Sequence, residues 1–199
     1  MRLWQSAMIG LAKSEKVTAA MQASPFMQRF ASQFIGGTDA SQALETVTRL
    51  RQRGLRTTLF YLGEYIRDAN LVEQCTAELL QLLPKLIEVG SDAHISVDPT
   101  QMGASIEWSL CVHNVQRLAD EMANLATPKR KVLMIDMEDS SLTQGTIERW
   151  RSLHTRGYPV AITIQAYLRR SEQDVRRLVE AGAAVRLVKG ALAETEAVA

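Results

Sequence analysis

Charged side chains follow several of the apolar runs in this sequence. The run Met134–Asp139 reads MIDMED, so that Asp136 and Glu138 alternate to one face of an extended segment. A carboxylate there can orient a substrate or bind a cationic amine, which makes Asp136 the first candidate catalytic residue and Glu138 a weaker one. The acidic residues can instead cap the helix that follows, a role that suits Asp139.

A second group of candidates lies in the run Arg186–Leu192, which reads RLVKGAL. Arg186 stands inside an apolar strand pattern, where a guanidinium needs an anionic partner. Lys189 can contact a phosphate, and Gly190 beside it permits close approach of a backbone. Arg186 can instead form a salt bridge to Asp136, and Lys189 can extend to solvent. The spacing alone does not decide between these roles.

Gln165 is the polar residue near the end of a third apolar run, residues 160–166. Its amide offers donors and an acceptor, which suits the edge of a heterocycle with mixed hydrogen bonding. The alternative is an interior glutamine that pairs with a polar neighbour. The three histidines and two cysteines show no metal-ligand spacing, so we expect no metal site.

The elements that must position these residues alternate between strands and helices. We expect strands at 55–62, 94–97, 131–137, 160–166 and 184–188. We expect helices at 40–53, 69–89, 105–126, 142–155 and 172–181, with one or two short helices within 11–34. This alternation predicts βαβ units and a parallel sheet, and the near-continuous apolar strands fit a sheet that is covered on both faces or closed into a barrel.

Two α/β architectures compete for this pattern. A doubly wound sheet usually carries a glycine-rich phosphate turn after its first strand, but here the strand ends in Leu62-Gly63-Glu64. Polar residues after several strands are typical of a (β/α)₈ barrel. We therefore expect a partial barrel of about five βα units over residues 40–199, preceded by an N-terminal helical segment over residues 1–39. A closed barrel needs roughly three more βα units.

The composition excludes several classes of function. The chain of 199 residues has 23 Lys and Arg against 22 Asp and Glu, a net charge of +1, which argues against a general nucleic-acid binder. No apolar run reaches the roughly 18 residues that span a bilayer. Two cysteines are too few for a secreted disulfide scaffold, so we expect free thiols and a cytoplasmic protein.

Five segments together resemble the proline dehydrogenase family. They are LFYLGE (59–64), HISVDPTQMG (94–103), VLMIDMED (132–139), ITIQAYLRR (162–170) and VRLVKGALAE (185–194), in the family's order. The resemblance implies a distorted (β/α)₈ barrel that binds FAD and oxidises L-proline to Δ1-pyrroline-5-carboxylate. It also implies a membrane quinone as electron acceptor, and so a cytoplasmic protein that can contact the inner membrane peripherally.

The resemblance also implies roles for individual residues. Asp136 matches the family's active-site aspartate, and Arg186 matches the arginine beside the reactive part of the flavin. A flavin that accepts hydride becomes anionic, and a fixed cation nearby stabilises that charge. Cofactor contacts are implied for Ile135, Gln165, Val188, Lys189, Gly190 and Ala191.

Several departures from the family pattern keep other hypotheses open. Asp98 stands at the substrate-binding position where the family usually has a lysine, Pro99 follows it, and Leu192 replaces an aromatic residue. The chain also ends before the family's last strands and the arginine pair that grips the proline carboxylate. A second hypothesis is therefore a non-catalytic, diverged fragment that acts through protein association or as an oligomer at exposed strand edges. A third is a Schiff-base lyase that uses Lys189.

Overall fold

The computed structural model describes residues 35–190, 192 and 194–199 of the chain. The chain divides into two compact units, residues 1–47 and residues 48–199. The short helices expected within 11–34 lie outside the described residues, as do most of the predicted segment 1–39 and Ala191.

In the first unit, the described residues form the start of a capped helix. This helix, α4 (Ala40–Gln52), begins where the sequence predicts. The Asp39 carboxylate accepts hydrogen bonds from the backbone nitrogen of Gln42 at 2.9 Å and from its side-chain amide at 2.8 Å. Asp39 thereby satisfies one of the free N–H groups in the first turn and caps the helix.

A parallel sheet forms the centre of the second unit. Its strands are β1 (Leu59–Phe60), β2 (Ala93–Val97), β3 (Lys131–Ile135), β4 (Val160–Gln165) and β5 (Ala184–Val188). They lie side by side in sequence order, and every neighbouring pair is parallel. A doubly wound sheet reverses its strand order at a switch point. The uninterrupted order therefore confirms the prediction of a partial barrel.

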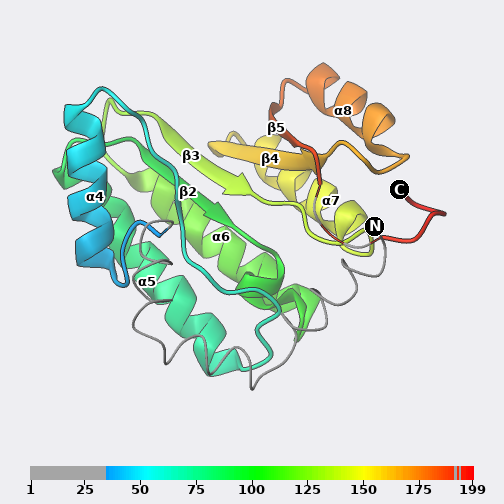
Figure 1. Ribbon diagram of the computed structural model, residues 1–199, viewed down its shortest axis with the longest axis horizontal. Coiled ribbons are helices and arrows are strands. Elements are labelled where there is room, and N and C mark those ends of the chain that lie inside the picture. Colours follow the sequence, from blue (N-terminus) through cyan, green and yellow to red (C-terminus); the bar gives the residue numbers. More distant parts are fainter. Residues whose placement is uncertain (1–34, 191, 193) are drawn as a thin grey trace, which may run out of the picture. The chain divides into compact units, whose positions relative to one another are not determined.

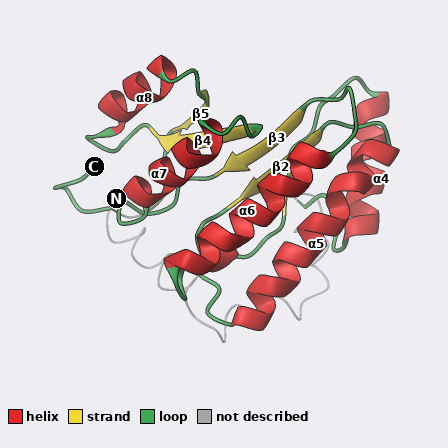
Figure 2. Ribbon diagram, turned by 180° about the vertical axis from the view of Figure 1, so that it is seen from behind, coloured by secondary structure: helices red, strands yellow, loops and turns green. Residues whose placement is uncertain are grey.

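Helices connect successive strands and cover one face of the sheet. They are α5 (Ala69–Glu88), α6 (Trp108–Asn124), α7 (Thr143–His154) and α8 (Ser171–Glu180). Figure 1 shows β2 and β3 in front of α5 and α6, whereas Figure 2, seen from behind, shows these helices in front of the strands. α5 packs on β2, α6 on β3 and α7 on β4. Helices on one face of a parallel sheet form the wall of a βα barrel, with the helices outside.

Apolar side chains fill the space between the sheet and its helices. Leu133 in β3, Ile162 in β4 and Trp150 in α7 are all fully buried. Burying a side chain of leucine size contributes about 1.5–3 kcal/mol relative to leaving it exposed. The apolar runs of the sequence thus correspond to strand and helix faces that share one core.

Two elements differ from their predicted bounds. β1 has two residues instead of the expected run 55–62, and directly after it the Tyr61 carbonyl accepts a hydrogen bond from the Gln101 side chain. α6 begins at Trp108, because a short π-helical turn, η1 (Thr100–Ala104), precedes it. Gly103 at the end of this turn has a φ of +111°, and a Cβ there would lie 2.7 Å from the Leu110 side chain.

Truncating a leucine in the central strand tests this placement of the core. Leu133 in β3 is 0% exposed, whereas Leu187 in β5 is 60% exposed. We expect Leu133→Ala to lower the free energy of unfolding by about 2–5 kcal/mol. The control Leu187→Ala should lower it by less than about 0.5 kcal/mol. Urea denaturation measures both values, and equal losses would contradict the burial of β3.

Candidate functional site

A polar network occupies the face of the sheet opposite the helices. The Arg186 guanidinium in β5 donates hydrogen bonds to Asp136, to Thr163 Oγ1 at 3.0 Å and to Ser96 Oγ at 3.2 Å. The Thr163 hydroxyl also donates to the Asp136 carboxylate. Asp136 directly follows β3, Thr163 lies in β4 and Ser96 lies in β2. One ion pair and its neighbours therefore connect four adjacent strands.

Arg186 and Asp136, the two candidate catalytic residues, form a salt bridge with each other. The side chains are 37% and 19% exposed, so the pair is partly shielded from water. The alternative that Arg186 pairs with Asp136 inside the fold is therefore what the structure shows. A shielded ion pair with additional hydrogen bonds holds both groups in one geometry.

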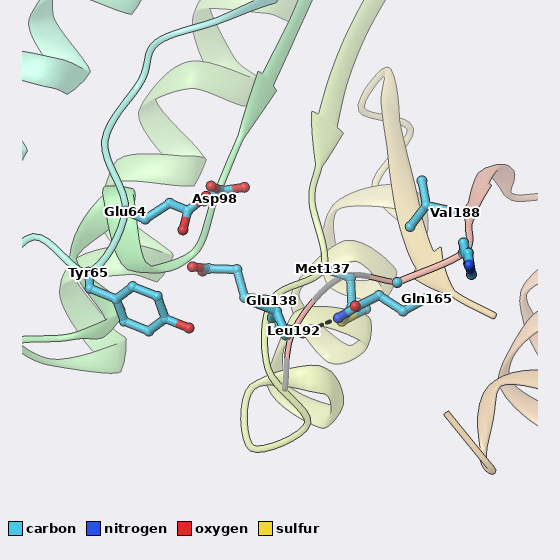
Figure 3. Close-up of a pocket in the computed structure, with 10 residues that line it drawn as sticks. Glu64, Tyr65, Asp98, Met137, Glu138, Gln165, Val188 and Leu192 are labelled. Atoms are coloured by element: carbon cyan, nitrogen blue, oxygen red, sulfur yellow. Dashed lines mark hydrogen bonds between the residues drawn. The ribbon is translucent and has the colours of Figure 1, made fainter. Parts of the chain in front are cut away.

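A cavity of about 380 Å³ lies beside this network, at the carboxyl ends of the strands. Figure 3 shows Glu64, Tyr65 and Asp98 on one side of it, and Gln165 and Val188 on the other. The first group follows β1 and β2, and the second lies at the ends of β4 and β5. Loops after the barrel strands are where ligands bind in this architecture.

Glu138 connects three of the loops around the cavity. Its carboxylate accepts hydrogen bonds from the Thr100 backbone nitrogen at 2.7 Å and from the Thr100 hydroxyl at 2.5 Å. Thr100 Oγ1 in turn accepts from the Tyr65 backbone nitrogen at 2.8 Å. Tyr65 has a φ of +54°, an unusual conformation for a residue with a large side chain. These bonds fix the loops after β1, β2 and β3 to one another.

Asp98 lies at the same end of the cavity and is 7% exposed. Burial, the largest cause, and the charges of Glu138, Asp136 and Glu64 together raise the pKa of Asp98 to about 8, although Arg186 acts in the opposite direction. Burial also raises the pKa of Glu138, against which the Thr100 hydrogen bonds act. Asp98 therefore holds its proton across much of the neutral range.

Gln165, Lys189 and Gly190, for which cofactor contacts are predicted, line the opposite end of the cavity. The Gln165 amide donates to the Glu138 carbonyl, and no described residue donates to its Oε1 atom. Gly190 has a φ of +100°, and a Cβ there would overlap the ring of Tyr167. The packing of Tyr167 therefore requires a glycine at this position. The sequence instead predicts that the glycine permits the close approach of a ligand to the backbone.

The remaining predicted residues fall at different distances from the cavity. Val188 lines it, whereas Asp136 and Arg186 lie next to the lining residues and not among them. Ile135 is buried and also lies outside the lining. Sequence reasoning gave no role to Tyr65 or to Thr100. Their position directly after the strands is the signal that could have found them.

In the part of the chain that the structure describes, no group of three or more His, Cys, Asp or Glu could hold a metal ion. Among the described helices, none combines the length and apolar character that a membrane span requires.

The strand order, the one-sided helices and the cavity define an α/β barrel-type protein with a cavity among its βα loops. A family model described as proline dehydrogenase matches residues 43–199. The chain belongs to the proline dehydrogenase family. Proline dehydrogenases are in general flavoproteins.

Individual relatives agree with this assignment. The chain is 31% identical over 170 residues to proline dehydrogenase 2 of Bacillus subtilis. The aligned region covers 85% of this chain and 54% of the relative. It is 24% identical over 203 residues to the proline dehydrogenase of Deinococcus radiodurans. That alignment covers 100% of this chain and 64% of the relative. The chain thus spans little more than half the length of the Bacillus relative.

A solved structure shows the same fold. Proline utilization A (PutA) from Bdellovibrio bacteriovorus, inactivated by N-propargylglycine, superposes with a TM-score of 0.68 at 25% identity. The match covers 83% of this chain and 20% of that protein. The parallel sheet described above therefore corresponds to part of a known barrel-type fold.

A double-mutant cycle tests the central ion pair. Arg186→Met leaves the Asp136 carboxylate without its cation, and we expect it to lower the free energy of unfolding by about 1–3 kcal/mol. The loss is smaller than for a fully buried pair, because both side chains are partly exposed. Asp136→Asn should cost a similar amount. The double variant should lose about 1–2 kcal/mol less than the sum. Additive losses in urea denaturation would show that the pair contributes no coupling.

Asp98 predicts a dependence of stability on pH. Its pKa is about 8 in the folded state against an ordinary value of 3.8, so between these values the folded chain binds more protons than the unfolded chain. Stability from this group is complete below about pH 4 and is lost as the pH rises toward 8. Asp98→Asn should remove that loss.

The measurement is the free energy of unfolding at pH 5 and at pH 8. Between pH 5 and pH 8, we expect the free energy of unfolding of the wild type to fall by roughly 3 kcal/mol more than that of Asp98→Asn. Glu180→Gln, at an exposed position of α8, is the matched control and should follow the wild type. Parallel curves for Asp98→Asn and the wild type would contradict a buried, protonated Asp98.

Proposed function

We propose that this chain provides part of the active site of a flavin-dependent enzyme that oxidises L-proline to Δ1-pyrroline-5-carboxylate. The observation that carries the proposal is the Arg186–Asp136 pair beside a cavity at the carboxyl ends of the strands, in a member of the proline dehydrogenase family. The chain spans 54% of the length of the Bacillus subtilis relative described above, so the proposal concerns the part of the site that β1 to β5 build.

The residues at the β4 and β5 side of the cavity fit a flavin ring. A volume of about 380 Å³ lies within the range of pockets that hold drug-sized ring systems. Gln165 offers an amide whose Oε1 atom receives no hydrogen bond from a described residue, and Lys189 offers a cation. We propose that these residues, with Val188 and the backbone of Gly190, hold the flavin of FAD. The bound flavin supplies the two-electron acceptor of the reaction.

Arg186 supplies positive charge near this side of the cavity. It is fixed before any ligand binds, because Asp136, Thr163 and Ser96 together hold its guanidinium. A preorganised cation stabilises developing negative charge without reorganising during the reaction. Asp136 then acts as the residue that positions Arg186. In this proposal the electrons pass on to a membrane quinone, which requires peripheral contact with the membrane.

One observation favours a second candidate function, association with another chain. Among the described residues, β5 pairs with β4 alone, which leaves its outer edge open. Leu187 in β5 is 60% exposed and Val179 in the adjacent α8 is 62% exposed. An open strand edge beside apolar side chains can pair with a further strand. Light scattering of the purified chain distinguishes a stable assembly from a monomer.

Flavin absorption tests the proposed oxidation. We expect the purified chain to bind FAD and its visible flavin absorption to decrease when L-proline is added. Arg186→Met should weaken FAD binding about tenfold or more, since it removes a fixed cation. Arg176→Met is the control, because Arg176 pairs with Glu172 on the exposed surface of α8. A monodisperse chain that binds no flavin would contradict the proposal, and a stable assembly that binds no flavin would favour association.

A further inference from the structure

Tyr65 combines two features that set it apart from the other residues around the cavity. Its φ of +54° lies in the left-handed region, and among the described residues no other side-chain-bearing residue has a positive φ. Its ring is also the one aromatic group among the described lining residues. A large side chain in the left-handed region costs free energy, and such strained positions gather at functional sites. Tyr65 is therefore a candidate for a role in binding.

A buried network holds the backbone of Tyr65 in this conformation. The Tyr65 backbone nitrogen donates a hydrogen bond to Thr100 Oγ1 at 2.8 Å, and the Thr100 hydroxyl donates to the Glu138 carboxylate at 2.5 Å. Thr100 and Glu138 are both buried. Hydrogen bonds that are shielded from water are costly to break, so they can offset the strain. The network thereby fixes the point from which the Tyr65 ring extends.

The ring of Tyr65 extends into the cavity. In Figure 3 it points from the loop after β1 toward Glu138 and Leu192, on the opposite side of the cavity from Gln165 and Val188. Tyr65 is 44% exposed, so a large part of its ring is not covered by other side chains. A ligand in the cavity can therefore pack against the ring.

The surroundings of the ring define what it can recognise. Met137 and Leu192 contribute further apolar surface to the same cavity. Burial, followed by the charge of Asp139, raises the pKa of Tyr65 to about 12, so the phenol is neutral at physiological pH. A neutral aromatic ring offers a large apolar surface with few rotatable bonds. This combination suits the carbon atoms of a small saturated ring.

We propose that Tyr65 is a specificity-determining residue that packs against the ring carbons of the substrate. The proposal rests on the proposed function for the identity of that substrate, L-proline, and adds the side chain that recognises its ring. N-methyl-L-alanine has the same secondary ammonium and carboxylate groups as L-proline but lacks the carbon that closes the ring. A site that recognises the ring should therefore distinguish these two compounds.

Calorimetric titration of the full 199-residue chain with L-proline and with N-methyl-L-alanine, without flavin, tests this role. We expect the wild type to bind L-proline roughly fivefold or more tightly than N-methyl-L-alanine. Tyr65→Ala should weaken L-proline binding and reduce that preference to within about twofold. Tyr65→Phe, which keeps the ring, should behave as the wild type. Tyr61→Ala is the matched control, because Tyr61 lies in the same loop, is 38% exposed and does not line the cavity.

Tyr65→Gly keeps the test decisive if Tyr65→Ala folds poorly, because glycine adopts a positive φ without steric cost. It should lose the preference for L-proline while its midpoint of urea denaturation stays close to that of the wild type or rises. The role of the ring would be overturned by a preference that survives in Tyr65→Ala or Tyr65→Gly. Loss of the preference in Tyr65→Phe or Tyr61→Ala, or binding of neither compound, would overturn it as well.

Binding and flavin absorption separate this role from the proposed oxidation. A chain that binds no FAD but prefers L-proline through Tyr65 contradicts the oxidation and supports the specificity role. A chain whose bound flavin responds to L-proline at the same concentrations in Tyr65→Ala and in the wild type supports the oxidation and overturns the specificity role.

Discussion

The site depends on how a guanidinium is accommodated on the inner face of a sheet. Arg186 interrupts an apolar strand, and its partial burial is tolerated because Asp136, Thr163 and Ser96 meet it from three other strands. These contacts require strands in sequence order whose ends are level, and the observed register supplies both. The cavity lies just beyond this network. The ion pair thus holds together the strand ends from which the loops around the cavity extend.

The parallel sheet and its helices could be predicted because their signals are local. Apolar periodicity and helix caps such as Asp39 act within a few residues, so most bounds agree to within a few positions. Of the predicted run 55–62, residues 59–60 alone form a strand, and the Tyr61 carbonyl that follows them bonds to the Gln101 side chain 40 residues away, a contact that no local pattern reveals. The π-helical turn at 100–104 depends on packing against Leu110, which no local pattern reveals.

The residues of the candidate site could be predicted where a polar residue interrupts or directly follows an apolar strand. Gln165 and Arg186 stand out because each is a polar residue in an apolar strand, and Asp136 follows one directly. Their mutual contacts could not be decided, since a salt bridge and a ligand contact require the same residue types. Glu138 and Thr100 could not be paired from the sequence, because their bond joins two loops whose approach is set by the sheet register.

The cavity has acidic side chains at one side and a lysine at the other. Lys189 lies at the β5 side, which suits a group that gains negative charge, whereas Asp98 and Glu138 lie at the side of β2 and β3, which suits a cation. L-proline carries its charged nitrogen and its carboxylate on the same carbon atom, so a molecule that places its nitrogen at the acidic side brings its carboxylate close to that side as well. Its oxidation therefore requires a cation that offsets Asp98 and Glu138.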